Sequence, residues 1–169
     1  MGRRVSILTI SLLATMAVGS VATARDAKPR IVVDVTMLKE VVVADGQGRR
    51  DVSLQDASST SPGDTLVLRI DYSNQGEAPA HNARVVDPIP EGTQLVPGSW
   101  TAPGAEMSVS VDGGQTWQSF PVRRPVTQAD GTTVMKEVEP SAYTHVRWTA
   151  REPLAPGDVR SATFKVKVR

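Results

Sequence analysis

The chain of 169 residues contains no cysteine, which excludes a disulfide framework, a lipidated cysteine and a thiolate nucleophile. Only two histidines are present, His81 and His145, and their separation suits neither a zinc site nor a catalytic pair. No basic stripe is present that could neutralise nucleic acid phosphates, because Arg123 and Arg124 form an isolated pair between prolines. We therefore expect no metal ion, no cofactor and no nucleic acid partner.

The first 24 residues have the pattern of a cleaved secretion signal. Arg3 and Arg4 supply the positive start, an apolar stretch spans residues 5–21, and Ala22-Thr23-Ala24 forms a small-residue cleavage site. Serine and threonine residues interrupt the apolar stretch, which favours a signal peptide over a membrane anchor. We expect export to the periplasm or the extracellular space, with a mature chain that does not span the membrane.

The remaining chain has the size of one domain. Removal of residues 1–24 takes away two of the 19 basic residues and none of the 18 acidic ones, so the net charge changes from +1 to about −1. Residues 25–30 are expected to form a flexible leader, and residues 31–169 to form a single domain with a core that needs no cross-links.

Alternation of apolar and polar residues predicts an all-β domain. Leu66, Leu68, Ile70 and Tyr72 recur at every second position, which is the period of a half-buried strand. No stretch has helical periodicity over more than two turns. The strands are expected at 31–43, as one bent or switching edge strand, at 51–55, 66–72, 85–86, 104–111, 117–122, 132–138, 143–150 and 159–168, with a turn at 45–48 and a loop at 125–133.

Strand alternation also predicts which side chains form the core. Trp148 and Phe164 lie on the apolar faces of their strands and are expected to be buried. His145 is expected to face solvent together with Tyr143 and Arg147, since the three residues occupy alternate positions.

A longer motif resembles the conserved repeat domain of bacterial surface proteins, domain of unknown function number eleven. The pattern consists of Pro62-Gly63-Asp64, Asn74, Gly76, Ala80, Asn82, Asp87, Pro90, Gly92, Thr93, Val146-Arg147-Trp148 and Pro153 to Asp158. The resemblance extends from about residue 65 to residue 169. It implies an immunoglobulin-like β-sandwich of the kind found in tandem on cell surfaces, although this chain contains a single copy.

Residues 110–117 match the Asp-box pattern S-x-D-x-G-x-T-W, which resembles the hairpin turns on the blades of sialidase-type propellers. In such a turn Asp112 accepts hydrogen bonds from backbone amides, glycines adopt positive φ, and Trp117 packs beneath the turn. A chain of this length with one box cannot build a propeller. We expect a structural role for Asp112 and Trp117, with a ligand role for Asp112 as the alternative.

The sequence contains no arrangement typical of a hydrolase. A G-x-S-x-G elbow is absent, and a glycosidase would need two carboxylates facing each other across a cleft. Asp64, Asp87, Asp112 and Asp158 are expected at turns, where hydrogen bonds to the backbone account for them. Calcium binding by loops at one end of the sandwich stays open, although no EF-hand-like run is present.

Trp100, between Gly98-Ser99 and Pro103-Gly104, is also expected to be exposed. It could contact a partner or a sugar, or cap the end of the sandwich. The sequence favours a non-enzymatic structural or adhesive interaction module of the bacterial cell envelope, whose partner would be an envelope protein or a glycan. The alternatives are a carbohydrate-binding module that uses exposed aromatics and an enzyme with a polar cleft.

Overall fold

The computed structural model describes residues 27–44, 46 and 50–169. The expected signal peptide and most of the expected turn at 45–48 lie outside this range. Within it, ten strands and one 3₁₀ helix are present: β1 (Ile31–Ala44), β2 (Arg50–Asp56), β3 (Thr65–Asn74), β4 (Arg84–Pro88), β5 (Thr93–Leu95), β6 (Ala105–Ser110), β7 (Arg123–Thr127), β8 (Thr133–Glu137), η1 (Pro140–Ala142), β9 (His145–Ala150) and β10 (Val159–Val168). The fold is therefore all-β, as the sequence predicts.

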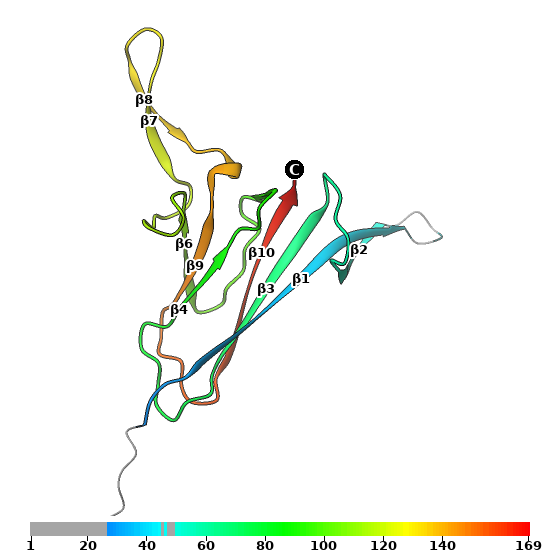
Figure 1. The fold of residues 1–169 in the computed structure, drawn as a ribbon, viewed down its shortest axis with the longest axis vertical. Coiled ribbons are helices and arrows are strands. Elements are labelled where there is room, and N and C mark those ends of the chain that lie inside the picture. The colour runs from blue at the N-terminus through cyan, green and yellow to red at the C-terminus, as the bar shows by residue number, and fades with distance from the viewer. Residues whose placement is uncertain (1–26, 45, 47–49) are drawn as a thin grey trace, which may run out of the picture.

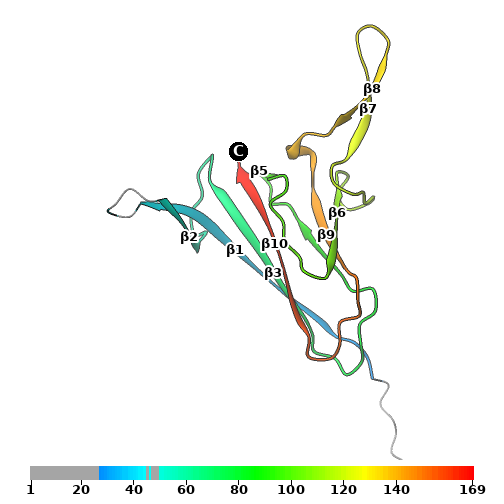
Figure 2. The same ribbon diagram turned by 180° about the vertical axis from the view of Figure 1, so that it is seen from behind.

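Two antiparallel sheets face one another, and a hairpin projects from them (Figures 1 and 2). The larger sheet has the strand order β2-β1-β3-β10-β5, and the smaller sheet has the order β4-β9-β6. The hairpin consists of β7 and β8, which pair only with each other. No helix in the described part of the chain has the length and apolar character needed to cross a lipid bilayer.

The core lies between the two sheets and is built from alternate residues of β3, β9 and β10. Leu68 and Phe164 lie opposite each other on the larger sheet, and Trp148 and Val146 face them from β9. Trp148 is 1% exposed and Phe164 is fully buried, which confirms their predicted place in the core. The period-two pattern of these strands is thus the direct cause of the sandwich.

A buried asparagine joins four segments at the end of β3. The Asn74 Oδ1 atom accepts hydrogen bonds from the backbone N–H groups of Arg30 (3.1 Å) and Gly76 (3.0 Å). Its Nδ2 atom donates to the backbone oxygens of Ala78 and Leu154, both at 2.8 Å. Every polar atom of this fully buried side chain has a partner, so its hydrogen bonds offset the cost of desolvation. Asn74 thereby fixes the entry to β1 and the approach to β10.

Two regions differ from the sequence prediction: an expected strand is absent at 117–122, and an expected loop at 125–133 forms part of a hairpin. Residues 117–122 do not form a strand, and only Gln118 pairs with β6, at Val109; Pro121 has no N–H with which to continue the ladder. The stretch 125–133, expected to be a loop, contains parts of both strands of the β7–β8 hairpin, where Pro125 is tolerated because the hairpin has free edges.

Residues 31–44 form one continuous strand that changes its neighbour along its length. β1 pairs with β3 from Ile31 to Lys39 and with β2 from Leu38 to Ala44. Figure 1 shows β1 along the border of the larger sheet, with β2 beside its distal part only. The expected switch is therefore a change of partner rather than a break in the strand.

Replacement of the central tryptophan tests how much of the stability depends on contacts between the sheets. We expect Trp148→Ala to lower the free energy of unfolding by roughly 3 to 5 kcal/mol, because the site cannot collapse around a lost indole. Urea denaturation followed by circular dichroism measures this loss.

The matched control for this substitution is Val159→Ala on β10, whose side chain is 69% exposed. Its effect should stay within about 0.5 kcal/mol. A loss of equal size in both variants would contradict the placement of Trp148 in the core.

Candidate functional site

The hairpin after β6 is held by a network around Asp112. Its Oδ1 atom accepts hydrogen bonds from the Thr116 N–H group (2.9 Å) and from the Ser110 hydroxyl (2.7 Å), and its Oδ2 atom accepts one from the Thr116 hydroxyl. These hydrogen bonds, those from Thr116 first, lower the pKa of Asp112 to about 2. Both oxygens of this carboxylate are therefore hydrogen-bonded within the turn itself.

Neutralising Asp112 should weaken this turn in a pH-dependent way. The folded-state pKa lies below the ordinary value of 3.8, so the carboxylate stabilises the fold above that value, and this contribution is lost as the pH falls through about 2. We expect Asp112→Asn to lower the melting temperature by a few degrees at pH 7 and to match the native protein near pH 2. Thermal melts between pH 2 and pH 7 measure the effect, and the substitution Glu91→Gln at an exposed position serves as control. A difference in melting temperature between Asp112→Asn and the native protein that stays constant at all pH values would contradict the prediction.

Trp117 follows the turn and lies over the outer face of the smaller sheet. The Arg147 guanidinium lies 4.5 Å from the centroid of its ring, a cation–π distance. Arg147 also donates a hydrogen bond to the Ser108 hydroxyl (3.0 Å). Burial, followed by the nearby Arg84 guanidinium, lowers the pKa of Arg147. A shallow groove of about 310 Å³ forms here, lined by Arg84, Glu106, Met107, Ser108, Trp117, Gln118, Ser119, Arg147 and Thr149.

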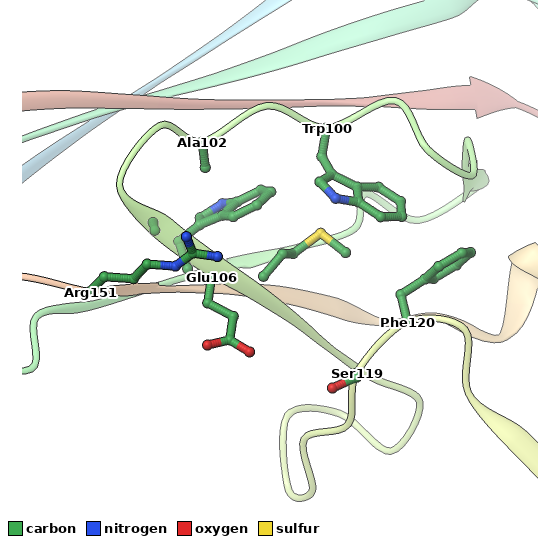
Figure 3. Close-up of a pocket in the computed structure, with 9 residues that line it drawn as sticks. Trp100, Ala102, Glu106, Ser119, Phe120 and Arg151 are labelled. Carbon is green, nitrogen blue, oxygen red and sulfur yellow. The ribbon is translucent and has the colours of Figure 1, made fainter.

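Trp100 is half-buried rather than exposed, because its ring packs against Phe120. The two ring centroids lie 4.9 Å apart in an edge-to-face arrangement. A cavity of about 380 Å³ lies next to these rings, lined by Trp100, Ala102, Ala105, Glu106, Met107, Ser119, Phe120, Trp148 and Arg151. Figure 3 shows Trp100 and Phe120 at one end of this cavity and Glu106 and Arg151 at the other. We call it the aromatic cavity.

One residue that lines the aromatic cavity has a buried polar atom without a partner. The indole Nε1 of Trp148 is buried and has no hydrogen bond within the described part of the chain. Leaving a buried donor unsatisfied costs about 1 to 3 kcal/mol. Trp148 lines the cavity, but its Nε1 atom has an accessible area below 1 Å² and is therefore covered by neighbouring atoms.

The strand β6 separates the aromatic cavity from the groove. Met107, Glu106 and Ser119 line both hollows. β6 is an edge strand of the smaller sheet, and the returning chain pairs with it only at Val109. The free edge of β6 at Met107 thus lies between two hollows, one on each face of the sheet.

Asp87 lies in β4 rather than in a turn, and its side chain points into the sandwich. It is 7% exposed, and its Oδ2 atom has no hydrogen bond among the described residues. Burial raises the pKa of Asp87, and the nearby His145 partly offsets this effect. The sequence missed this position because Pro88 and Pro90 suggested a turn, whereas the strand continues to Pro88.

A neutral residue at position 87 should therefore stabilise the fold at neutral pH. Because the folded-state pKa of Asp87 is raised, the stability that the neutral carboxyl allows is fully present below its ordinary pKa of 3.8. This stability is lost as the pH rises through the folded-state pKa. We expect Asp87→Asn to raise the free energy of unfolding at pH 7 by about 1 kcal/mol and to have a smaller effect near pH 4. Urea denaturation at the two pH values decides this; a destabilised variant at pH 7 would show that the charge is stabilising instead.

The two histidines lie in separate environments, and Tyr143 lies close to only one of them, His145. His81 is exposed, and His145 lies beside Trp117, with ring centroids 6.5 Å apart. Tyr143 is buried, contrary to the expectation that it faces solvent, because it precedes β9 and accepts a hydrogen bond from the Val122 N–H group (3.1 Å). In the described ranges, no three His, Asp or Glu side chains gather in a position to hold a metal ion.

Sequence reasoning identified Trp100, Asp112 and Trp117 as candidates but not the edge that separates the aromatic cavity from the groove. No sequence pattern identified Met107, because its backbone is free only where residues 117–122 no longer pair with β6. Pro121 was the local sign that this pairing would stop early.

Comparisons of this sequence with protein-family models, with curated proteins and with solved structures find no match. The functional conclusion therefore depends on the geometry of the sheets and their edges.

Proposed function

We propose that the protein is an exported, non-enzymatic interaction module of the bacterial cell envelope, with a structural or adhesive role. The observation that carries this proposal is the free edge of β1 between Ile31 and Met37, a stretch that has no neighbouring strand on its outer side in the described part of the chain. Such an edge can accept a strand from another protein by main-chain hydrogen bonding.

The register of the larger sheet shows which groups this edge presents. Asn74 exchanges backbone hydrogen bonds with the β10 side of the sheet, through Asp158 and Gly157. Alternation in an antiparallel ladder then directs Ser73 and Asp71 toward β1, where they lie opposite Val32 and Asp34. The N–H and C=O groups of the intervening residues, including Val33 and Val35, therefore point away from β3, toward the free edge.

Side chains at the same positions form an uncovered apolar row. Val33, Val35 and Met37 lie opposite Tyr72, Ile70 and Leu68, all of which face the core. The three nevertheless remain 44%, 48% and 37% exposed. An added strand would bury part of this apolar surface, at about 25 cal/mol per Å².

The sequence supports export and the envelope setting. The pattern of residues 1–24 is that of a secretion signal, and the resemblance to a repeat domain of surface proteins implies an interaction role without catalysis. The surroundings of two acids support a non-catalytic role: Asp112 is hydrogen-bonded within its own turn and Asp87 is buried, whereas a glycosidase requires two carboxylates that face each other across a cleft.

A photo-crosslinking residue at Val33 tests strand addition in cells that export the protein. We expect a light-dependent adduct of defined mass, and we expect Val35→Pro to reduce it by at least about tenfold, because proline removes an N–H group that faces the free edge.

Val35→Thr is the matched control, because it keeps this N–H group and should keep the adduct. The same crosslinker at Val126, an exposed residue of the projecting hairpin, should not give that adduct. An adduct that survives Val35→Pro, or no adduct from Val33 at all, would contradict the proposal.

A carbohydrate-binding role is the second candidate. The observation that favours it is the placement of Trp100 beside a cavity that also contains the polar side chains of Arg151 and Glu106. Sugar rings stack on aromatic faces, and their hydroxyl groups accept hydrogen bonds from a guanidinium and donate them to a carboxylate. The half-burial of Trp100 against Phe120 leaves less of its face open than a stacking platform needs.

A further inference from the structure

We propose that the free edge of β6 binds an extended peptide segment that places one aromatic side chain in the aromatic cavity. This site is separate from the β1 edge, and the proposal depends on different observations. It requires a backbone that can pair with a partner and a cavity on the correct face of the strand. The structure provides both at Met107.

Hydrogen bonding at Val109 fixes the direction of the Met107 backbone. Val109 and Gln118 exchange two backbone hydrogen bonds, at 2.9 and 3.0 Å, across the free side of β6. Met107 is two residues away on the same strand, so its N–H and C=O groups point to the same side. Neither group has a hydrogen bond in the described ranges, because the returning chain has left the edge by Phe120.

The side chain of a residue paired with Met107 would enter the aromatic cavity. Residues that lie opposite each other in a sheet share a face, and Met107 lines the cavity together with Trp100, Phe120 and Trp148. The volume of about 380 Å³ lies within the ordinary range of ligand sites, roughly 300 to 1,000 Å³. A tyrosine side chain brings an aromatic ring that can pack against the rings of Trp100 and Phe120.

Two hollows on opposite faces favour a peptide over a glycan. Successive side chains of a strand point to opposite faces, so the neighbours of the tyrosine would lie toward the groove beside Ser108 and Trp117. The free N–H and C=O pair of Met107 also matches a peptide backbone. A sugar has neither side chains that alternate between two faces nor a backbone that pairs with the Met107 N–H and C=O groups.

The test uses the mature domain labelled with ¹⁵N and the peptide acetyl-Thr-Val-Tyr-Val-Thr-amide. We expect titration to shift the Met107 amide and the Trp148 indole N–H signals together. The matched peptide with alanine in place of tyrosine should bind at least about tenfold more weakly, since it leaves the cavity empty.

Two phenylalanine variants separate the cavity from general effects of the loop. Ala102 lines the cavity, so Ala102→Phe should fill it and weaken the tyrosine peptide by at least about tenfold. Thr101 is exposed in the same loop, and Thr101→Phe should leave binding unchanged. Melting curves of both variants verify that each is folded.

Chitotriose serves as the carbohydrate probe in the same experiment. Peptide binding that depends on tyrosine and is blocked only by Ala102→Phe supports the proposal. Binding of chitotriose with a shift at Trp100 but none at Met107 would overturn it in favour of a glycan site. No shift from the tyrosine peptide at millimolar concentration would overturn it as well, and would leave the β1 edge unaffected.

Discussion

The unequal width of the two sheets determines most of the surface features of this protein. Burial of apolar side chains drives the sheets together, but three strands cover only part of a sheet of five. Trp148 and Phe164 fill the covered part. Val33 and Val35 lie on the same face of the larger sheet, yet remain about half exposed. A sandwich of this kind is stable through its centre and leaves its border available for another chain.

The two free edges differ in what they offer to a partner. At β1 the backbone is open from Ile31 to Met37 and carries an apolar row, which suits a long strand and gives little selectivity. At β6 the open backbone is short, and the adjacent cavity would select one side chain. The Asp112 turn contributes indirectly, because it places Trp117 over Arg147 and so forms one wall of the groove. In the proposed binding modes, the first edge would contribute mainly affinity and the second mainly specificity.

Local periodicity explains why some of this structure could be predicted from the sequence. The alternation in residues 66–72 and 159–168 identified two central strands and their buried faces, since side-chain direction in a strand depends only on position. Tyr143 and Trp100 were misplaced because their burial depends on distant partners, the Val122 N–H group and the Phe120 ring. Asp87 was misplaced because Pro88 and Pro90 suggested a turn, whereas the strand continues to Pro88. The sequence indicated an edge strand in residues 31–43, but not the open edge of β6, because an edge is defined by the absence of a neighbour. The resemblance to the surface repeat domain stays a prediction.

Amide hydrogen exchange of the isolated domain tests most directly whether the border of the larger sheet is free. Alternation in the ladder predicts that the amides of Val33 and Val35, which point away from β3, exchange quickly. The amides of Asp34 and Thr36, which point toward β3, should be protected by at least about a hundredfold more. Exchange rates that alternate in this way along β1 would confirm an edge that is ready to accept a strand. Uniform protection from Val32 to Thr36 would show that the edge is already paired, and would contradict the account.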